Sequence, residues 1–230
     1  DYRSSGYSYL QEEQSRAAEE MLDRAEDSDR AAAYINALSL MNAENARLQQ
    51  DSDTALYFYD LLSEDSKDPE FQTFARRRAA AIQLSKGDIL AARMQLENSP
   101  TDETASLHAL ELYASGKDKS PMVGGLWGLI PGAGYWYSGE SANGFRSLIL
   151  NSLFIFGMVQ TAEDEQWGAF AAIAFFEVTW YSGSIYGGVD SAQRYNKDRL
   201  DTTIDAIDGN ASYLPDTAIT APIFKLKIMF

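Results

Sequence analysis

The 230-residue chain contains no cysteine and a single histidine, His108. Without cysteine the chain can form no disulfide, no thiolate metal site and no cysteine nucleophile. A single histidine also excludes a metal site built from several histidines. It excludes any Ser-His-Asp triad that would leave a second histidine free. No carboxylate pair stands out in an apolar setting, as acid–base chemistry would require. We therefore expect no enzymatic activity and no cofactor or metal.

Positive charge is scarce as well. The chain has 19 lysine and arginine residues against 34 aspartate and glutamate residues, which gives a net charge of −15. Such a chain repels a phosphate backbone, so we expect no nucleic acid partner. The basic run Arg76–Arg78 is interpreted either as a grip for an acidic partner or lipid, or as a solvated helix face.

The first half of the chain has the pattern of helices. From Tyr9 to about Asp118, apolar residues recur at three- and four-residue steps and alanine is abundant. Polar clusters, glycine and proline interrupt this pattern at regular intervals, which predicts about six helices joined by short turns. The expected breaks are Asp27–Asp29, Gln50–Asp53, Lys67–Pro69, Lys86–Asp88 and Ser99–Asp102.

One segment of this half, Thr73–Ser99, resembles a tetratricopeptide-type repeat. Small or apolar residues stand where two helices would cross, and glycine stands at the turn between them. The residues that carry the resemblance are Ala80, Gly87, Asp88, Ala92 and Leu96. The resemblance implies that residues 1–119 form an array of antiparallel helical hairpins. The tryptophan–glycine–tyrosine pattern of the consensus is missing, so a generic helical bundle remains the alternative.

The composition changes after Lys119, and residues 120–209 are predicted to form a second region. A segment rich in glycine and aromatic residues leads into two apolar runs, residues 146–162 and 167–189, which an acidic break separates. A helix of about 20 residues crosses a bilayer core, so the runs are just long enough to span one. We expect a transmembrane helical hairpin followed by a polar exit helix. A hairpin buried in a soluble domain is the alternative.

The segment Ile130–Phe145 carries a motif that supports the membrane interpretation. It resembles the proline–glycine-x-glycine–glutamine-x-tyrosine-x-glycine pattern found ahead of paired hydrophobic helices in TM2-like and related bacterial membrane-associated families. The matching residues are Pro131, Gly132, Gly134, Tyr137 and Gly139, and Tyr135 replaces the usual glutamine. The resemblance implies a membrane-associated hairpin in contact with lipid, and it implies no chemistry.

Two charged residues stand within or beside the apolar runs, Arg146 and Glu177. A carboxylate in the middle of a span is costly unless it is paired, protonated or facing a cavity. Glu177 could find Arg146, Asn151 or a partner subunit. It could instead face the lumen of a pore that a homo-oligomer of hairpins surrounds, which would make the protein a channel or transport component.

The last region, residues 210–230, ends in an alternating pattern that predicts a short β-strand. The residues on its apolar face are Phe224, Leu226, Ile228 and Phe230. A lone strand must pair with something. We expect it to add to a partner protein, with docking on this protein's own helices as the alternative.

Together these patterns predict a mainly α protein with a helical array, an apolar hairpin and a terminal strand. The corresponding function is a non-enzymatic, membrane-attached adaptor that binds other subunits of a bacterial envelope complex. The chain begins at Asp1, so we expect a cleaved signal peptide and a periplasmic helical region. The outer flanks of the hairpin are basic and its loop is acidic, which in an inner membrane would place both flanks in the cytoplasm. That placement conflicts with a periplasmic helical region, so the outer membrane is favoured.

Overall fold

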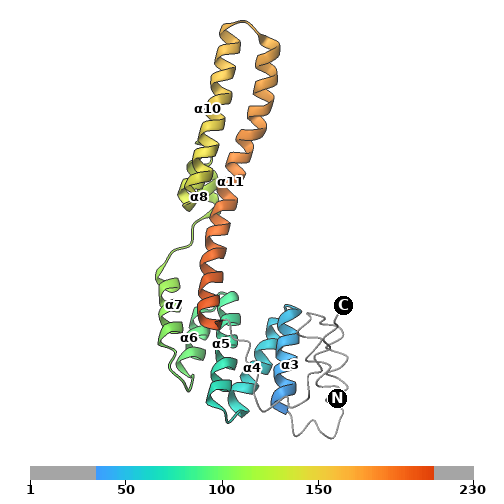
Figure 1. Cartoon of the computed structure of the whole chain (residues 1–230), viewed down its shortest axis with the longest axis vertical. Coiled ribbons are helices and arrows are strands. Elements are labelled where there is room, and N and C mark those ends of the chain that lie inside the picture. Colours follow the sequence, from blue (N-terminus) through green and yellow to red (C-terminus); the bar gives the residue numbers. More distant parts are fainter. Residues whose placement is uncertain (1–34, 210–230) are drawn as a thin grey trace, which may run out of the picture. The chain divides into compact units, whose positions relative to one another are not determined.

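The computed structural model describes residues 35–209, and within them every regular element is a helix (Figure 1). The chain is therefore mainly α, as predicted. It divides into two compact units, one formed by residues 115–202 and the other by the residues on either side. The strand expected at Phe224–Phe230 lies outside the described residues.

Within the described residues, the first unit contains five consecutive helices and the last residues of α11. They are α3 (Ile35–Leu48), α4 (Ser52–Asp65), α5 (Pro69–Ser85), α6 (Ile89–Glu97), α7 (Thr104–Ser115) and, from Thr203, the end of α11 (Trp167–Asp208). An aspartate caps each of three starts, because its carboxylate accepts a backbone N–H of the first turn. Asp51 caps α4, Asp68 caps α5 and Asp88 caps α6. The breaks predicted at these positions are the observed helix ends.

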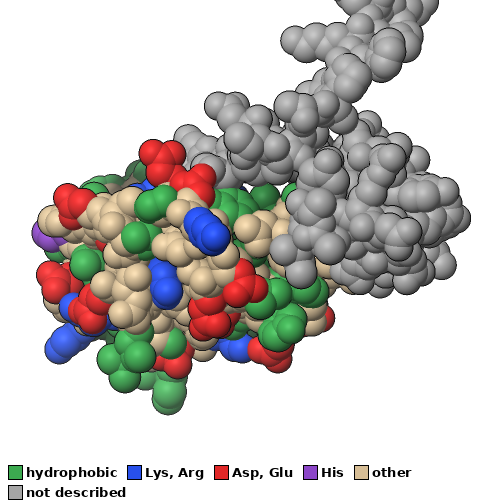
Figure 2. Space-filling view, turned by 90° about the horizontal axis from the view of Figure 1, so that it is seen from below, with side chains coloured by type: hydrophobic (Ala, Val, Ile, Leu, Met, Phe, Trp, Pro, Cys, Tyr) green, Lys and Arg blue, Asp and Glu red, His purple; other side chains and the backbone are tan. Residues whose placement is uncertain are grey.

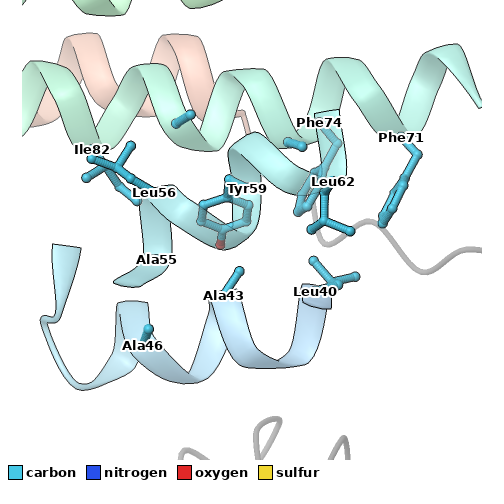
Figure 3. Close-up of a cluster of buried hydrophobic side chains, with 12 residues drawn as sticks. Leu40, Ala43, Ala46, Ala55, Leu56, Tyr59, Leu62, Phe71, Phe74 and Ile82 are labelled. Carbon is cyan, nitrogen blue, oxygen red and sulfur yellow. The ribbon is translucent and has the colours of Figure 1, made fainter. Parts of the chain in front are cut away.

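Consecutive helices from α3 to α6 pack on one another around small and apolar side chains. Tyr59 on α4 is fully buried at the centre of this core (Figure 3). Its hydroxyl donates a 2.6 Å hydrogen bond to Glu44 on α3. Small side chains let the helices approach closely. The fully buried alanines include Ala43, Ala55, Ala75, Ala80 and Ala92. The helix pair expected around Gly87 is present, and Gly87 itself has a left-handed φ of 83°.

Two of the three arginines in Arg76–Arg78 bind internal carboxylates. Arg77 Nε lies 2.8 Å from Glu103 Oε1, and Glu103 is almost fully buried just before α7. Arg78 pairs with Asp208 and also lies 3.5 Å from Glu44. Neither the solvated face nor the grip for an external acidic partner describes these two side chains. They are internal ties between elements of the first unit.

The second unit consists of two short helices followed by a long helical hairpin. The short helices are α8 (Pro121–Trp127) and α9 (Ala133–Ser138), and the hairpin is α10 (Ser141–Glu163) with α11 as far as Thr202. The paired helices run side by side (Figure 1), and a loop of residues 164–166 joins them. Ser147 Oγ donates to Ser184 Oγ at 3.0 Å, while Gly157 lies opposite Ile173. These two contacts fix the antiparallel register.

Among residues 35–209, α10 alone is both long enough and apolar enough to cross a membrane. Its mean hydropathy over 18 residues is 1.3, and only 17% of that window is buried within the protein. The apolar part of α11 is as long, but Glu177 and several serines and glycines lower its hydropathy.

Candidate functional site

The motif segment before α10 folds into a compact turn whose glycines are needed by the backbone. Gly132 caps the start of α9 with a φ of 85°, and Gly139 caps its end with a φ of 88°. Residues other than glycine are strained in this left-handed region of φ. A side chain on Gly132 would also overlap the carbonyl of Gly144 in α10. Gly132 and Gly139 of the predicted motif are therefore turn residues, and they set the direction in which the chain enters α10.

Four glycines, Gly124, Gly128, Gly134 and Gly188, form what we call the glycine junction, where α8, α9 and α11 meet. A Cβ on Gly134 would lie 2.7 Å from the carbonyl oxygen of Gly124 and 2.8 Å from Cα of Gly188. A Cβ on Gly128 would lie 2.7 Å from Cα of Ile185. No real Cβ approaches backbone this closely. The helices are in backbone-to-backbone contact, the packing that small residues allow between helices in lipid.

Buried serines satisfy the polar groups of the glycine junction. Ser191 on α11 is fully buried and lies 3.0 Å from Ser138 on α9, Oγ to Oγ. Ser191 Oγ also donates to the carbonyl of Gly188 at 3.1 Å. Buried hydroxyls need such hydrogen-bond partners. The junction is therefore tightly packed, and its serine hydroxyls are hydrogen-bonded within it.

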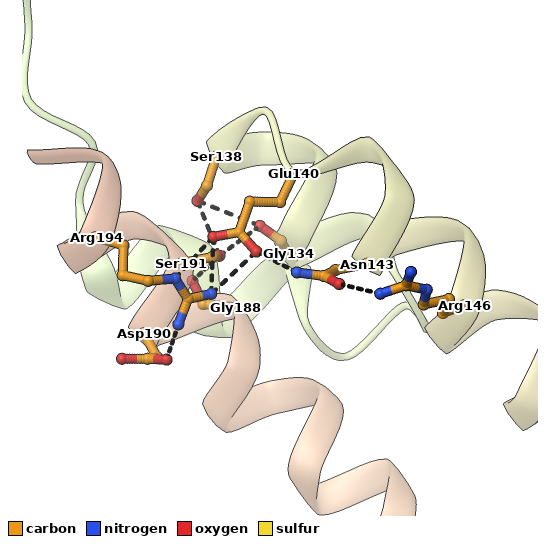
Figure 4. A network of polar contacts seen from close by, with 9 residues as sticks. All are labelled: Gly134, Ser138, Glu140, Asn143, Arg146, Gly188, Asp190, Ser191 and Arg194. Atoms are coloured by element: carbon orange, nitrogen blue, oxygen red, sulfur yellow. Dashed lines mark hydrogen bonds and ion pairs between the residues drawn. The ribbon is translucent and has the colours of Figure 1, made fainter. Parts of the chain in front are cut away.

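A set of charged and amide side chains, which we call the polar girdle, surrounds the base of the hairpin (Figure 4). Glu140 accepts from Arg194 Nε at 2.9 Å and Nη2 at 2.7 Å, a bidentate pair. Arg194 also pairs with Asp190, and Asn143 Nδ2 donates to Glu140 at 2.6 Å. The hydrogen bond to Glu140 raises the pKa of the Arg194 guanidinium above its ordinary value. The girdle joins the start of α10 to α11.

Tyr137, the motif tyrosine, holds the chain that enters α8. Its hydroxyl accepts the Ser120 N–H at 3.0 Å, and its carbonyl accepts Lys119 Nζ at 2.5 Å. The Lys119 ammonium also lies 4.2 Å from the centre of the Tyr195 ring, a cation–π distance. Asn196 completes the attachment by donating to the Lys119 carbonyl at 2.9 Å. The basic side chain at the entrance is thus fixed.

Arg146 is placed differently from the other arginines of the second unit. Arg194 and Arg199 each pair with a carboxylate, whereas Arg146 donates to the Asn143 amide oxygen at 3.3 Å. Within residues 35–209 no carboxylate lies within ion-pair distance of Arg146. The side chain is exposed on the second turn of α10. It does not pair with Glu177, which was one of the partners considered for that carboxylate.

Glu177 lies on the face of α11 that also carries Ile173 and Ser184, the residues that contact α10. The residue is 7% exposed, and its Oε2 atom is buried with no hydrogen-bond partner. Asn151 on α10 is fully buried, and its Oδ1 atom likewise has no partner. The register places the two residues about three residues, or roughly 4.5 Å, apart along the hairpin axis. Two acceptors without donors therefore lie within one helical turn of each other.

Replacing Glu177 by glutamine should stabilise the hairpin or leave it unchanged. The amide supplies an N–H donor for the Asn151 oxygen and removes a carboxylate, a net gain of about 1 kcal/mol. Replacement by leucine fills similar space but leaves Asn151 Oδ1 unpaired, so it should not show this gain. Thermal unfolding of the full chain in detergent measures both. A lower Tm for Glu177→Gln than for Glu177→Leu would contradict the pairing.

Large apolar side chains cover the outside of the second unit, and we call them the apolar belt. They lie on α8, α10 and the first half of α11, and many are more than half exposed. The belt includes Met122, Leu126, Phe145, Ile149, Leu153, Phe156, Val159, Phe175, Phe176, Val178 and Tyr186. Single exposed apolar residues are common on soluble proteins, but a continuous surface of this kind marks a contact with lipid or with protein.

Sequence reasoning located the motif glycines and the charged residues of the hairpin, but it missed the short helices α8 and α9. Their sequence is rich in glycine, which lowers helix propensity and hides the helical period. Proline at the start of α8 with Ser120 as its cap was the available signal. The bond between Glu140 and Arg194 joins residues 54 apart, and no local pattern reveals such a pair.

Nothing in the described residues forms a metal centre: no group of three or more histidine, aspartate or glutamate side chains could hold an ion. The contacts described above make the junction, girdle and belt of the second unit the candidate site. Comparison with protein families, with curated proteins and with solved structures found no match for the chain.

Proposed function

We propose that the protein is a non-enzymatic membrane-attached adaptor, with the hairpin of α10 and α11 inserted in a lipid bilayer and the first unit available to partner proteins. The observation that carries the proposal is the apolar belt. Phe156 and Leu153 are 66% and 64% exposed in the middle of α10. Exposing this apolar surface to water is unfavourable in free energy, whereas lipid hydrocarbon solvates it.

The dimensions of the hairpin fit a bilayer. α10 has 23 residues, which rise about 34 Å against a hydrocarbon core of about 30 Å. The polar girdle stands at one end of this length, and three acidic residues, Glu163 at the end of α10 with Asp164 and Glu165 in the loop, stand at the other. Apart from Arg146, which lies near the girdle end of α10, no exposed charged group stands between the two ends, and this is the pattern of a membrane span. The exposed Trp136 and Trp180 suit the interface between lipid and water.

The partner-binding part of the proposal rests on the first unit. Consecutive helices from α3 to α6 pack on one another, and we propose that they form a tetratricopeptide-like array, which would present a groove to another protein. On the face drawn in Figure 2, acidic, basic and hydrophobic side chains are interspersed. Leu90 and Met94 are exposed one turn apart on α6, and such apolar side chains suit a protein contact. An envelope complex, with the outer membrane preferred, remains the proposed setting.

The channel alternative places Glu177 toward a pore that several hairpins would surround. The burial of Glu177 between α10 and α11 favours a packing role within one hairpin. The two functions differ in a flux assay with the full chain reconstituted in vesicles. We expect no solute or ion flux above that of empty vesicles. Flux that Glu177→Gln abolishes would support the channel and overturn the adaptor.

Replacing Leu153 by arginine should weaken membrane integration. A charge at the middle of a span costs about 2.5–3.5 kcal/mol, so a large share of the variant should move to the soluble fraction on carbonate extraction of membranes. Wild-type protein should stay in the membrane fraction.

The matched control is Leu90→Arg, which makes the same substitution at an equally exposed leucine of the first unit. It should leave the membrane fraction unchanged. The proposal fails if carbonate releases the wild-type protein, or if the full chain is a stable monomer without detergent.

A further inference from the structure

A pocket of about 300 Å³ opens on the second unit between α9, α10 and α11. It lies where the polar girdle gives way to the apolar belt. Both kinds of side chain line it: Arg146 and Asn143 are polar, and Leu150 and Trp180 are apolar. The remaining lining residues are Tyr135, Ser147, Thr179, Gly183 and Ser184.

We propose that this pocket binds the phosphate group of an anionic phospholipid. The inference rests on the proposed membrane insertion, because insertion brings headgroups to the level of the girdle. A guanidinium binds phosphate oxygens through two parallel N–H donors, and Arg146 has no carboxylate partner that would compete. Basic pockets between membrane helices are a recurring form of headgroup site.

The neighbouring contacts hold Arg146 for this role. Asn143 donates to Glu140 through its amide nitrogen at 2.6 Å and accepts Arg146 through its amide oxygen at 3.3 Å (Figure 4). This fixes the orientation of the amide and directs the guanidinium. The hydroxyl of Tyr135 adds a donor to the lining.

The charge around the pocket selects an anionic headgroup over a zwitterionic one. The acidic groups of the girdle, Glu140 and Asp190, are both bound by Arg194, and Glu177 on α11 is buried. A choline or ethanolamine ammonium would therefore find no free carboxylate there. A pocket of this volume accommodates a headgroup, while the acyl chains of the lipid would lie along the exposed apolar belt.

Tyr135 is the position where the chain departs from the glutamine of the motif it resembles, and its ring forms one wall. A Cβ on Gly187 of α11 would overlap the Tyr135 side chain, so the ring lies directly against the glycine backbone. Gly183, one turn earlier on α11, has no atom within 4 Å of where its Cβ would be. A side chain at Gly183 would thus enter the pocket without meeting backbone.

The test is thermal stabilisation of the purified full chain in a neutral detergent. Short-chain phosphatidylglycerol is titrated in one arm, short-chain phosphatidylcholine in a second and inorganic phosphate in a third. Ligands that bind the folded state raise its Tm with concentration. We expect a clear rise with phosphatidylglycerol, and at least a tenfold weaker effect with each of the other two.

Two variants remove the site in different ways. Arg146→Gln removes the charge, and Gly183→Leu fills the space while keeping the charge. Both should weaken phosphatidylglycerol binding by about tenfold or more, whereas Arg146→Lys should retain part of it. Lys197→Gln, which removes an exposed cation elsewhere on α11, should bind like the wild type.

The outcomes separate this inference from the proposed function. Carbonate extraction of Arg146→Gln should still leave it in the membrane fraction, because only the headgroup contact is lost. Equal stabilisation by inorganic phosphate would overturn lipid as the source. Binding unchanged by both Arg146→Gln and Gly183→Leu would overturn the pocket, even if the hairpin is integral. Release of the wild type by carbonate would overturn membrane insertion instead.

Discussion

Gly188→Ala should prevent the second unit from folding stably. The new methyl group would overlap the carbonyl of Gly124, which is backbone and cannot rotate away. Overpacking usually costs about 1–3 kcal/mol, and we expect the upper end or more here because two helix backbones must separate. The full chain in detergent should lose most of its resistance to protease in α8–α11, or show a Tm lowered by several degrees.

Gly168→Ala is the matched control on the same helix. No atom lies within 4 Å of where its Cβ would be, so alanine meets open space. Alanine is the better helix former by about 1 kcal/mol in water, and this variant should be as stable as the wild type or more so. Equal effects at Gly168 and Gly188 would show that close packing at the junction is not the cause.

Arg78→Ala should destabilise the first unit by about 3–5 kcal/mol, the usual cost of leaving a buried charge without its partner. The guanidinium lies between Glu44 on α3 and Asp208 at the end of α11, and Arg78 and Asp208 are each 15% exposed in their side chains. Tyr59 donates to the same Glu44, so the loss should reach the core. Hydrogen exchange of amides in α3–α5 measures the opening free energy directly.

Two comparisons isolate the buried charge as the cause. Arg93→Ala removes an arginine whose partners Glu97 and Glu111 are more than half exposed, and such surface pairs contribute about 0–1 kcal/mol. The triple variant Arg78→Ala, Glu44→Gln, Asp208→Asn removes the charges together and should recover part of the loss. No recovery in the triple variant would contradict the assignment.

The same cluster predicts a pH dependence. Burial raises the pKa of Asp208 above its ordinary value of 3.8, while Arg78 acts in the opposite direction. A raised pKa means that the folded state binds a proton more readily than the unfolded state. This contribution to stability is therefore present at low pH and is lost as the pH rises through the raised pKa. Without Arg78 the pKa of Asp208 rises further. The loss of stability in Arg78→Ala should therefore become smaller as the pH is lowered toward 4.

Local signals accounted for most of the helix limits in the first unit. Asp51, Asp68 and Asp88 cap helices within a few residues, and capping is a matter of neighbours in sequence. The breaks that these residues predict are therefore the observed ones. Ion pairs between residues far apart in the sequence could not be predicted from such local signals. The run Arg76–Arg78 looked solvent-facing because its carboxylate partners Glu103 and Asp208 lie far along the chain.

The candidate site shows the same division. The motif glycines were identified from the family pattern that the segment resembles, and two of them, Gly132 and Gly139, occupy left-handed turns. Their partner across the junction, Gly188, belongs to a different helix, and only the fold brings it to Gly124 and Gly134. The pocket at Arg146 likewise needs three helices to form. Residues were identifiable from the sequence, but their neighbours were not.

The acidic loop between α10 and α11 has a kinetic consequence. Glu163, Asp164 and Glu165 are all exposed at the end of the hairpin. If the hairpin crosses a bilayer, these three carboxylates must pass through hydrocarbon, at about 2.5–3.5 kcal/mol for an acidic side chain at its centre. The barrier to escape would exceed the barrier to entry by the free energy gained on insertion. Such a protein would require an insertion machinery once, and would then remain where it was delivered rather than exchange between compartments.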